Sequence, residues 1–226
     1  MKRWIMGLVV TGGLAWMDES HAARLTLGDF SSQNLNGWQR KSFQGENQWQ
    51  FEHASHAPDP DLYHLRVQSN DTAEGMIRKE TVDLKQWPIL HWSWRVALPL
   101  PEGAEQTRAG DDFAARIGII IADGPFPWQT YGINYVHSST LPAGTHWQSP
   151  YSDHVFMLAV ARNGQDHNEW QHFRRNVAMD FKQLFNRDID RIQAVAIMVD
   201  TDNTHGKAQT WFGDVFFSDQ SHPPTP

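Results

Sequence analysis

The chain contains no cysteine. This absence excludes disulfides, a thiol nucleophile, cysteine-ligated metals and a lipid-modified N-terminal cysteine. Disulfides are most needed by small exported domains, whereas a chain of 226 residues is long enough to bury a core that is stable without them. Hydrophobic packing must therefore hold this fold together.

Positive charge and long apolar runs are also scarce. There are 19 Lys and Arg against 26 Asp and Glu, which gives a formal net charge of -7. Such a chain lacks the basic face that nucleic acid requires. The apolar run at residues 4–16 is too short and too interrupted by glycine to span a membrane. We therefore expect no nucleic-acid partner and no membrane insertion of the mature protein.

Residues 1–22 have the composition of a secretory signal peptide. Lys2 and Arg3 supply a positive start, an apolar run follows, and Ser20-His21-Ala22 ends in the small-x-small pattern that signal peptidase cleaves. We expect cleavage after Ala22, or one residue later, and export to the periplasm. Full secretion is the alternative destination.

Short segments rich in β-branched and aromatic residues recur along the chain, separated by turns of Gly, Pro, Asn and Asp. They predict strands over residues 24–30, 49–52, 63–67, 75–79, 89–97, 113–122, 131–138, 154–161, 170–174, 194–199 and 210–217. Residues 177–186 instead carry apolar side chains at helical spacing, which predicts one short helix. This pattern predicts an all-β fold, a single-domain β-sandwich over residues 23–218, followed by a disordered tail at 219–226.

Tryptophan is abundant, with 11 residues in the whole chain. Its flat apolar face and single donor suit both a protein core and a sugar-binding surface. We expect most of these rings to fill the space between two sheets. Trp128 and Trp147, which are flanked by predicted loops, are the better candidates for exposed contact with a ligand.

The two ends of the predicted domain carry short motifs: Leu-Gly-Asp-Phe at 27–30, Gly-Trp at 37–38 and Trp-Phe-Gly-Asp-Val-Phe-Phe at 211–217. This combination resembles the jelly-roll modules of the galactose-binding-like type, whose shape many carbohydrate-binding modules share. The resemblance implies that the first and last strands lie side by side. It also implies that acidic residues near them hold a structural calcium, for which Asp29 and Asp214 are the candidates. We expect no other cofactor.

A second resemblance covers most of the chain. It rests on Trp-x-Trp-Arg-Val at 92–96, Gly-Asp-Asp-Phe-Ala-Ala-Arg at 110–116, Asn-Tyr-Val at 134–136, Pro-Tyr-x-Asp at 150–153 and Asp-Thr-Asp-Asn-Thr at 200–204. In these motifs the sequence resembles the bacterial family DUF3047. The resemblance implies no activity, because the family has no assigned function.

The predicted strands 89–97 and 113–122 each place an arginine among apolar residues. The simplest arrangement pairs them as neighbours, with Arg95 and Arg116 on the same side of one sheet, because alternate residues of a strand share a face. A concave face with two arginines could bind an acidic sugar or another anion. The other candidates for that face are Asp112, Tyr135 and His137.

A structural alternative is that each arginine pairs with Asp111, Asp112 or Asp153 and so fixes a loop, since a buried guanidinium needs a partner. The structural alternative is favoured for Asp111. For Arg116 we expect an accessible cleft.

The segment 200–204 has two interpretations as well. Its Asp200, Asp202 and Asn203 side chains could ligate calcium through oxygen, or could form a turn by bonding the nearby backbone. The segment lacks the Gly and the terminal Glu of an EF-hand loop, so the turn is favoured.

The remaining motifs exclude more than they identify. The sequence has no zinc-binding helix motif, no Gly-x-Ser-x-Gly elbow and no phosphate-binding loop. We expect a non-catalytic binding module for a carbohydrate or other anionic ligand. The alternative is a polysaccharide-active enzyme, either a hydrolase that pairs Asp112 with Asp153 or Asp202, or a lyase with Tyr135 or His137 as the base. A structural role in an envelope complex is a second alternative, and the sequence predicts no oligomeric state.

Overall fold

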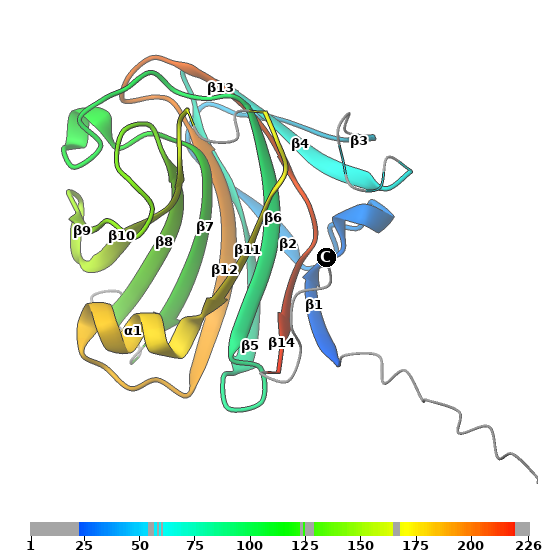
Figure 1. Ribbon diagram of the computed structural model, residues 1–226, viewed down its shortest axis with the longest axis vertical. Coiled ribbons are helices and arrows are strands. Elements are labelled where there is room, and N and C mark those ends of the chain that lie inside the picture. Colours follow the sequence, from blue (N-terminus) through cyan, green and yellow to red (C-terminus); the bar gives the residue numbers. More distant parts are fainter. Residues whose placement is uncertain are drawn as a thin grey trace, which may run out of the picture.

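The computed structural model describes residues 23–53, 57, 59, 61–122, 124, 129–164 and 168–219. Two seven-stranded sheets face each other across this part of the chain (Figure 1). The first sheet contains β1 (Arg24–Gly28), β14 (Val215–Ser218), β6 (Ile89–Leu98), β13 (Lys207–Phe212), β4 (Tyr63–Asn70) and β3 (Gln48–His53), with β11 (Gln171–Asn176) also paired to β6. The second sheet runs in the order β2 (Trp38–Gln44), β5 (Ala73–Asp83), β12 (Arg191–Asp200), β7 (Phe113–Ala122), β8 (Thr130–Ser138), β10 (Ser152–Arg162) and β9 (His146–Ser149).

The predicted all-β sandwich with one helix is confirmed. The helix α1 (Val177–Phe185) begins after Asn176, whose side chain accepts the Met179 N–H, and ends at Asn186 in the left-handed conformation. It lies at one end of the sandwich (Figure 1). Short 3-10 turns occupy Phe30–Ser32 and Arg108–Gly110. Among the described residues, none of the helices has the length and hydrophobicity needed to cross a membrane.

The first and last strands lie side by side, as the jelly-roll resemblance implies. Strand β1 pairs antiparallel with β14, with Arg24 opposite Ser218. The predicted strand 210–217 is divided, because β13 ends at Phe212 and β14 begins at Val215. At the break, Asp214 accepts hydrogen bonds from the backbone N–H and the hydroxyl of Ser31, both at 2.8 Å.

The sequence patterns do not predict two of the strands, β2 and β9. Six of the seven residues of β2 are exposed, so the alternation of apolar and polar side chains is missing there. Strand β9 has only four residues and pairs with β10. Neither strand carries a hydrophobic pattern long enough to be recognised.

The expected pairing of strands 89–97 and 113–122 is wrong. Strand β6 belongs to the first sheet, and β7 belongs to the second, between β12 and β8. Both strands turn an apolar face to the shared core: Trp92 and Trp94 from β6, and Ile117 from β7. The arginines are therefore on opposite outer surfaces of the sandwich rather than on one face.

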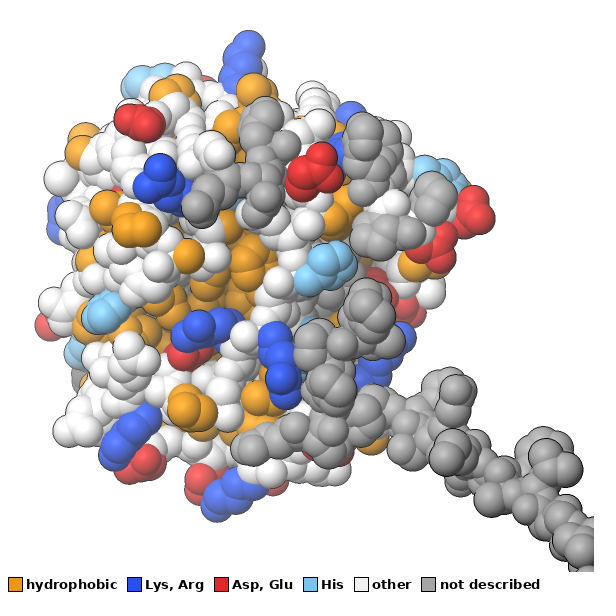
Figure 2. Space-filling view, in the orientation of Figure 1, with side chains coloured by type: hydrophobic (Ala, Val, Ile, Leu, Met, Phe, Trp, Pro, Cys, Tyr) orange, Lys and Arg blue, Asp and Glu red, His pale blue; other side chains and the backbone are white. Residues whose placement is uncertain are grey.

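The core between the sheets is rich in aromatic rings. Trp92 stacks on Tyr135 and on Phe173, with ring centroids 5.2 and 5.0 Å apart. Figure 2 shows apolar side chains on the floor of a hollow above α1. Val160 on β10 and Phe173 on β11 are only partly buried against the core. The two sheets therefore do not cover the whole core in this region.

A buried polar group joins α1 to the second sheet. The Tyr135 hydroxyl donates to Asp180 Oδ2 at 2.7 Å, and Arg175 Nε donates to the same oxygen at 2.9 Å. Tyr135 is 0% exposed and Asp180 is 5% exposed. The carboxylate therefore has its donors within the protein, and this group is structural.

The Tyr135→Phe variant tests this structural role. It leaves Asp180 with one donor fewer in a buried position, so we expect the free energy of unfolding to fall by about 1–3 kcal/mol. Urea denaturation measures the change, with Tyr63→Phe at the start of β4 as the control. Unchanged stability in Tyr135→Phe would contradict the structural role and return Tyr135 to the ligand-binding candidates.

Candidate functional site

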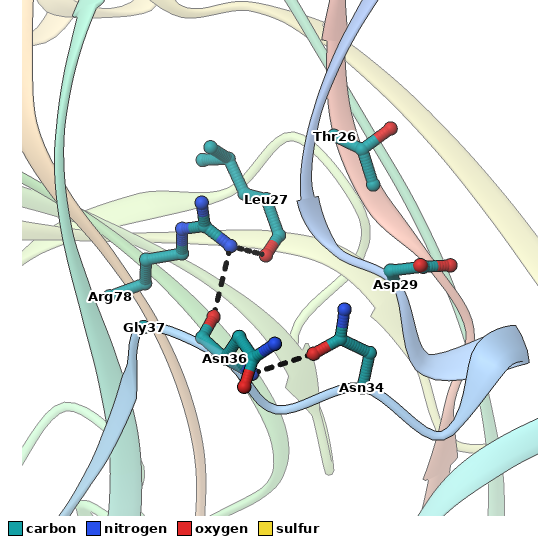
Figure 3. A pocket seen from close by; sticks show the side chains of 7 residues that line it. All are labelled: Thr26, Leu27, Asp29, Asn34, Asn36, Gly37 and Arg78. Carbon is teal, nitrogen blue, oxygen red and sulfur yellow. Dashed lines mark hydrogen bonds between the residues drawn. The ribbon is translucent and has the colours of Figure 1, made fainter.

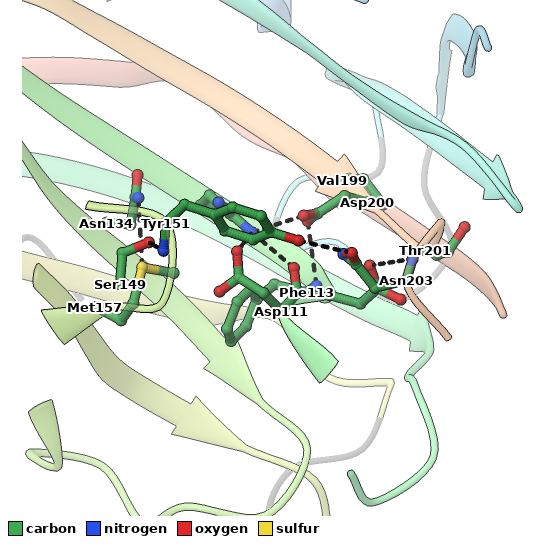
Figure 4. A network of polar contacts seen from close by, with 12 residues as sticks. Asp111, Phe113, Asn134, Ser149, Tyr151, Met157, Val199, Asp200, Thr201 and Asn203 are labelled. Atoms are coloured by element: carbon green, nitrogen blue, oxygen red, sulfur yellow. Dashed lines mark hydrogen bonds and ion pairs between the residues drawn. The ribbon is translucent and has the colours of Figure 1, made fainter. Parts of the chain in front are cut away.

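Polar residues from two neighbouring strands converge where β12 ends and β7 begins (Figure 4). Antiparallel neighbours bring the end of one strand to the start of the next, and here Asp200 lies opposite Phe113. The Phe113 N–H donates to Asp200 Oδ1 at 3.1 Å. We call the converging acidic residues the aspartate cluster; its members are Asp111, Asp112, Asp200 and Asp202.

Arg116 is the cation of this cluster. Its guanidinium lies 2.6 Å from Asp200 Oδ2 and 3.9 Å from Asp111 Oδ2, and 4.8 Å from the centre of the Phe113 ring. The side chain is only 11% exposed. Arg116 therefore neutralises part of the cluster, and a side chain this buried does not line the accessible cleft expected around it.

Asp112 holds the turn that follows β12. Its Oδ1 accepts the Asn203 N–H at 3.1 Å, and its Oδ2 accepts the Thr204 N–H and hydroxyl at 2.7 and 2.6 Å. The segment 200–204 thus forms a turn, and the N–H groups of Asn203 and Thr204 are satisfied by the carboxylate of Asp112, just before β7, rather than by the turn's own side chains. Sequence reasoning missed Thr204, because only the fold brings it to Asp112.

The cluster changes the acidity of its members. Burial raises the pKa of Asp200 to about 7 and that of Asp111 to about 6, and neighbouring carboxylates add to the rise while Arg116 opposes it. Burial also raises the pKa of Asp202. These carboxylates therefore titrate as a coupled group rather than independently.

An exposed aromatic ring lies over the cluster (Figure 4). Tyr151 is 54% exposed, and its hydroxyl lies 3.0 Å from Asn203 Oδ1 and 3.2 Å from Arg108 O. The Arg108 guanidinium is 5.2 Å from the ring centre, and its Nε donates to Pro150 O at 3.0 Å. The ring is thus held in place while one face stays open to solvent.

Sequence reasoning named Tyr151 only as part of a family motif and did not predict its role. The available signal was its position: an aromatic residue directly after a proline, in a turn with no apolar alternation on either side. Such a ring has no core to enter.

Next to the cluster lies the outer face of the second sheet. Gly118 on β7, Ala196 on β12 and Asn134 on β8 are register partners and share this face. A Cβ atom at Gly118 would lie 3.0 Å from Asn134 Oδ1 and 3.4 Å from Ala196 Cβ. Because Gly118 has no side chain, nothing projects from the sheet at this position.

The cluster also contains a group that could be considered for a metal. Asp112, Asp200 and Asp202 offer oxygens within 4.8 Å of one another. However, both Asp112 oxygens accept N–H groups, and those of Asp200 contact the Phe113 N–H and Arg116. A cation would have to displace Arg116, so this oxygen set fits a metal poorly.

Asp29 and Asp214, the calcium candidates, lie near the β1–β14 pair. Asp214 already binds Ser31 through both oxygens. Asp29 lines a polar hollow of about 380 Å³ (Figure 3), together with Thr26, Leu27, Asn34, Asn36, Gly37 and Arg78. Within the described residues neither aspartate joins a group of three acidic or histidine ligands, and calcium there stays a prediction.

The hollow itself has a structural explanation. Arg78 donates from one guanidinium nitrogen to Leu27 O at 2.6 Å and to Asn36 O at 3.2 Å (Figure 3). It ties β1 to the turn before β2, where Gly37 has a φ of 82° that favours glycine. This contact organises the edge of the sandwich.

Other predicted site residues lie away from the cluster. Arg95 is 3% exposed on the outer surface of the first sheet, with its guanidinium 4.1 Å from the centre of the Trp211 ring. Tyr135 and His137 are buried on β8, at 0% and 6% exposure. The structure therefore does not bring these residues to one ligand-binding face with Arg116.

Three further candidates have different outcomes. The expectation of an exposed ring at Trp147 is wrong, because the side chain is 8% exposed and packs with Phe113 and Met157 in a small second core outside the sheet. The Asp153 side chain is 84% exposed and lies 3.8 Å from His154, so it does not fix an arginine loop. Trp128 lies outside the described residues.

The fold and the cluster define a β-sandwich protein with a polar site at one end of β12 and β7, two central strands of its second sheet. The sequence matches DUF3047, described as "Protein of unknown function", over residues 36–216. The chain therefore belongs to this family, as its motifs indicate. Comparison with curated proteins gives no match.

Solved structures of similar architecture have little sequence in common with this chain. A family 11 carbohydrate-binding module from Clostridium thermocellum, in complex with a β-1,3-1,4-mixed-linked tetrasaccharide, is 9% identical with a TM-score of 0.45, over 88% of this chain and 97% of that one. The family 11 module of the cellulosomal cellulase Lic26A-Cel5E of Clostridium thermocellum is 9% identical with a TM-score of 0.47, over 90% and 100%. The glycoside hydrolase domain of Endo-D from Streptococcus pneumoniae R6 is 9% identical with a TM-score of 0.41, over 83% of this chain and 22% of that one. The likeness concerns architecture alone.

The pH dependence of stability tests the electrostatics of the cluster. The pKa of Asp111 is raised from 3.8 to about 6, so folding favours the protonated form. Its contribution to stability is complete below the unfolded pKa and is lost as the pH rises through about 6. We expect Asp111→Asn to be more stable than the wild type at pH 8 by roughly 1–3 kcal/mol, and the difference to vanish near pH 4.

Urea denaturation across this pH range measures the effect. Asp153→Asn is the matched control, because that side chain is 84% exposed and should leave the profile unchanged. If the free energies of unfolding of Asp111→Asn and the wild type change with pH in parallel, folding does not raise the pKa of Asp111 and the prediction is wrong.

Proposed function

We propose that the protein binds carbohydrate at the surface formed by Tyr151 and the aspartate cluster. The observation that carries the proposal is an aromatic ring, 54% exposed, held over carboxylates and a guanidinium. An aromatic ring contacts the C–H face of a sugar, while carboxylate, amide and guanidinium groups hydrogen-bond its hydroxyls. Both kinds of contact meet at this surface.

The charge of the cluster favours a neutral sugar over an acidic one. Arg116 is already paired with Asp200 at 2.6 Å, and it faces more carboxylates than it can neutralise. A uronate or phosphate would add negative charge beside them, which is unfavourable at this distance. Of the ligands expected from the sequence, a carbohydrate or another anionic ligand, the charge of the cluster therefore favours a neutral carbohydrate.

Binding is preferred to catalysis because Asp112, which belongs to both suggested carboxylate pairs, is engaged in the fold. Asp202 does lie near it, with oxygens of the two residues within 4.8 Å of each other. Both Asp112 oxygens accept hydrogen bonds from the 200–204 turn, and Asp153 has a highly exposed side chain near His154. Tyr135 is buried in the core against Asp180. Asp112 and Tyr135 are therefore not free to serve a reacting sugar at the cluster.

The Tyr151→Ala variant tests the proposal. It removes the ring and leaves the cluster, so we expect affinity for the bound polysaccharide to fall roughly tenfold or more, since one lost ring contact costs about 1–2 kcal/mol. Tyr151→Phe keeps the ring but loses the contact with Asn203, and should lose less. Affinity electrophoresis in gels containing β-glucan, β-mannan, β-xylan, β-galactan or polygalacturonate measures the change.

Met179→Ala on α1 is the control, because Met179 is 67% exposed and lies away from the cluster. The proposal is overturned if the wild type binds none of the neutral polysaccharides, or if Tyr151→Ala binds as tightly as the wild type. Release of new reducing ends or unsaturated products would replace binding with catalysis.

We also propose that the protein is exported to the periplasm. Support comes from the composition of residues 1–22 and from β1, which begins at Arg24, just beyond the predicted cleavage site.

Expression in a Gram-negative host tests export. Osmotic shock should release a protein that begins at Ala23 or Arg24 by mass spectrometry. Ala22→Arg should retain the leader, whereas His21→Ala, which changes only the middle position of the motif, should not. Wild-type protein recovered from the cytoplasm with residues 1–22 attached would contradict export.

A further inference from the structure

Rows of register partners cross the outer face of the second sheet. Lys41 on β2 lies opposite Gly75 on β5, Gly75 opposite Met198 on β12, and Met198 opposite Arg116 on β7. Antiparallel partners point to the same side of a sheet, so this row joins β2 to the aspartate cluster. The adjacent row contains Gln39, Ile77, Ala196, Gly118 and Asn134.

The middle of these rows carries small or apolar side chains. Gly75 and Gly118 carry no side chain and are buried, and Ala196 carries one methyl group and is half-buried. Ile77 and Met198 are half-buried although they face away from the core. Ile77, Ala196 and Met198 therefore give the outer face a partly exposed apolar patch that a ligand can contact.

An exposed aromatic ring lies near each end of these rows, one at β2 and one where β7 begins. Phe43 is 67% exposed and Tyr151 is 54% exposed. Lys41 Nζ lies 5.8 Å from the centre of the Phe43 ring, which places Phe43 on the outer side of β2. Tyr151 lies over the aspartate cluster, where β7 begins (Figure 4). Three strand spacings separate β2 from β7, a span of about 14 Å.

We infer that the ligand is an extended neutral polysaccharide that crosses the second sheet from Tyr151 to Phe43. The inference rests on the proposed carbohydrate binding and names the form of the glycan. Both rings can be covered only by a chain of several sugars, whereas a single sugar or a short end reaches one ring. Lys41 and Gln39 provide donors along the path, and the face is not closed at the β2 edge, where six of seven residues are exposed.

Chain length and Phe43 together test the inference. Isothermal titration calorimetry uses oligosaccharides of two to six sugars from the same four neutral polysaccharides. We expect affinity to rise with length, and Phe43→Ala to weaken the longest chain roughly tenfold while leaving the disaccharide unchanged. Ala196→Phe, which raises the floor between the rings, should weaken long chains as well. Met179→Ala, equally exposed at 67%, is the control, and circular dichroism verifies the fold of each variant.

The outcomes separate this inference from the proposed function. If Phe43→Ala binds the longest chain as tightly as the wild type, or if affinity stops rising at two sugars, the extended-chain inference is overturned while loss of binding in Tyr151→Ala keeps the proposed function. If the wild type binds none of the four polysaccharides, the proposed function itself is overturned.

Discussion

The antiparallel pairing of β7 with β12 decides where the polar residues of this protein meet. Asp111 lies two residues before β7 and Asp200 ends β12, so the pairing brings them together at one end of these two strands. Arg116 then bridges 84 residues of sequence to reach Asp200 at 2.6 Å. Loss of either partner would leave a nearly buried charge alone, which is a costly arrangement. The turn held by Asp112 and the position of Tyr151 both depend on this junction.

Two buried carboxylate groups show how the fold treats charge differently. Asp180 receives donors from Tyr135 and Arg175 inside the protein, and this group connects α1 to the second sheet. The aspartate cluster instead gathers several carboxylates around one guanidinium, and the pKa values of Asp111 and Asp200 rise to about 6 and 7. Perturbed acidity next to an exposed ring is typical of functional sites, whereas satisfied pairs in the core are structural.

Sequence patterns predict where the strands and the helix of this fold lie along the chain better than they predict which strands pair. The predicted strand 113–122 coincides with β7, and the predicted helix 177–186 differs from α1 by one residue. Alternation reports which face of a strand is apolar, and it cannot say whether two such strands pair within a sheet or face each other across a core. For this reason β6 and β7 were expected as neighbours although they lie in opposite sheets.

The same limit applied to the site. The motifs at 110–116 and 200–204 each contain acidic residues, but only strand order brings them together. Trp147 was expected at the surface because its flanks read as loops, yet β9 pairs with β10 and turns the ring onto Met157. Burial of a single aromatic depends on which segments cover it, and that information is not local in sequence.

Exposure, rather than residue type, distinguishes the two arginine–aromatic pairs on the outside of the sandwich. Arg95 and Trp211 are 3% and 6% exposed, with the guanidinium 4.1 Å from the ring centre, so this pair is closed and locks the first sheet. Arg108 and Tyr151 are more loosely stacked at 5.2 Å, and the ring is 54% exposed. In both pairs a guanidinium contacts a ring, but only the second leaves an aromatic face in water beside hydrogen-bonding groups. A solvent-facing ring that is already held in position loses little conformational freedom when a ligand covers it, which is why we place the proposed binding face on the second sheet and not on the first.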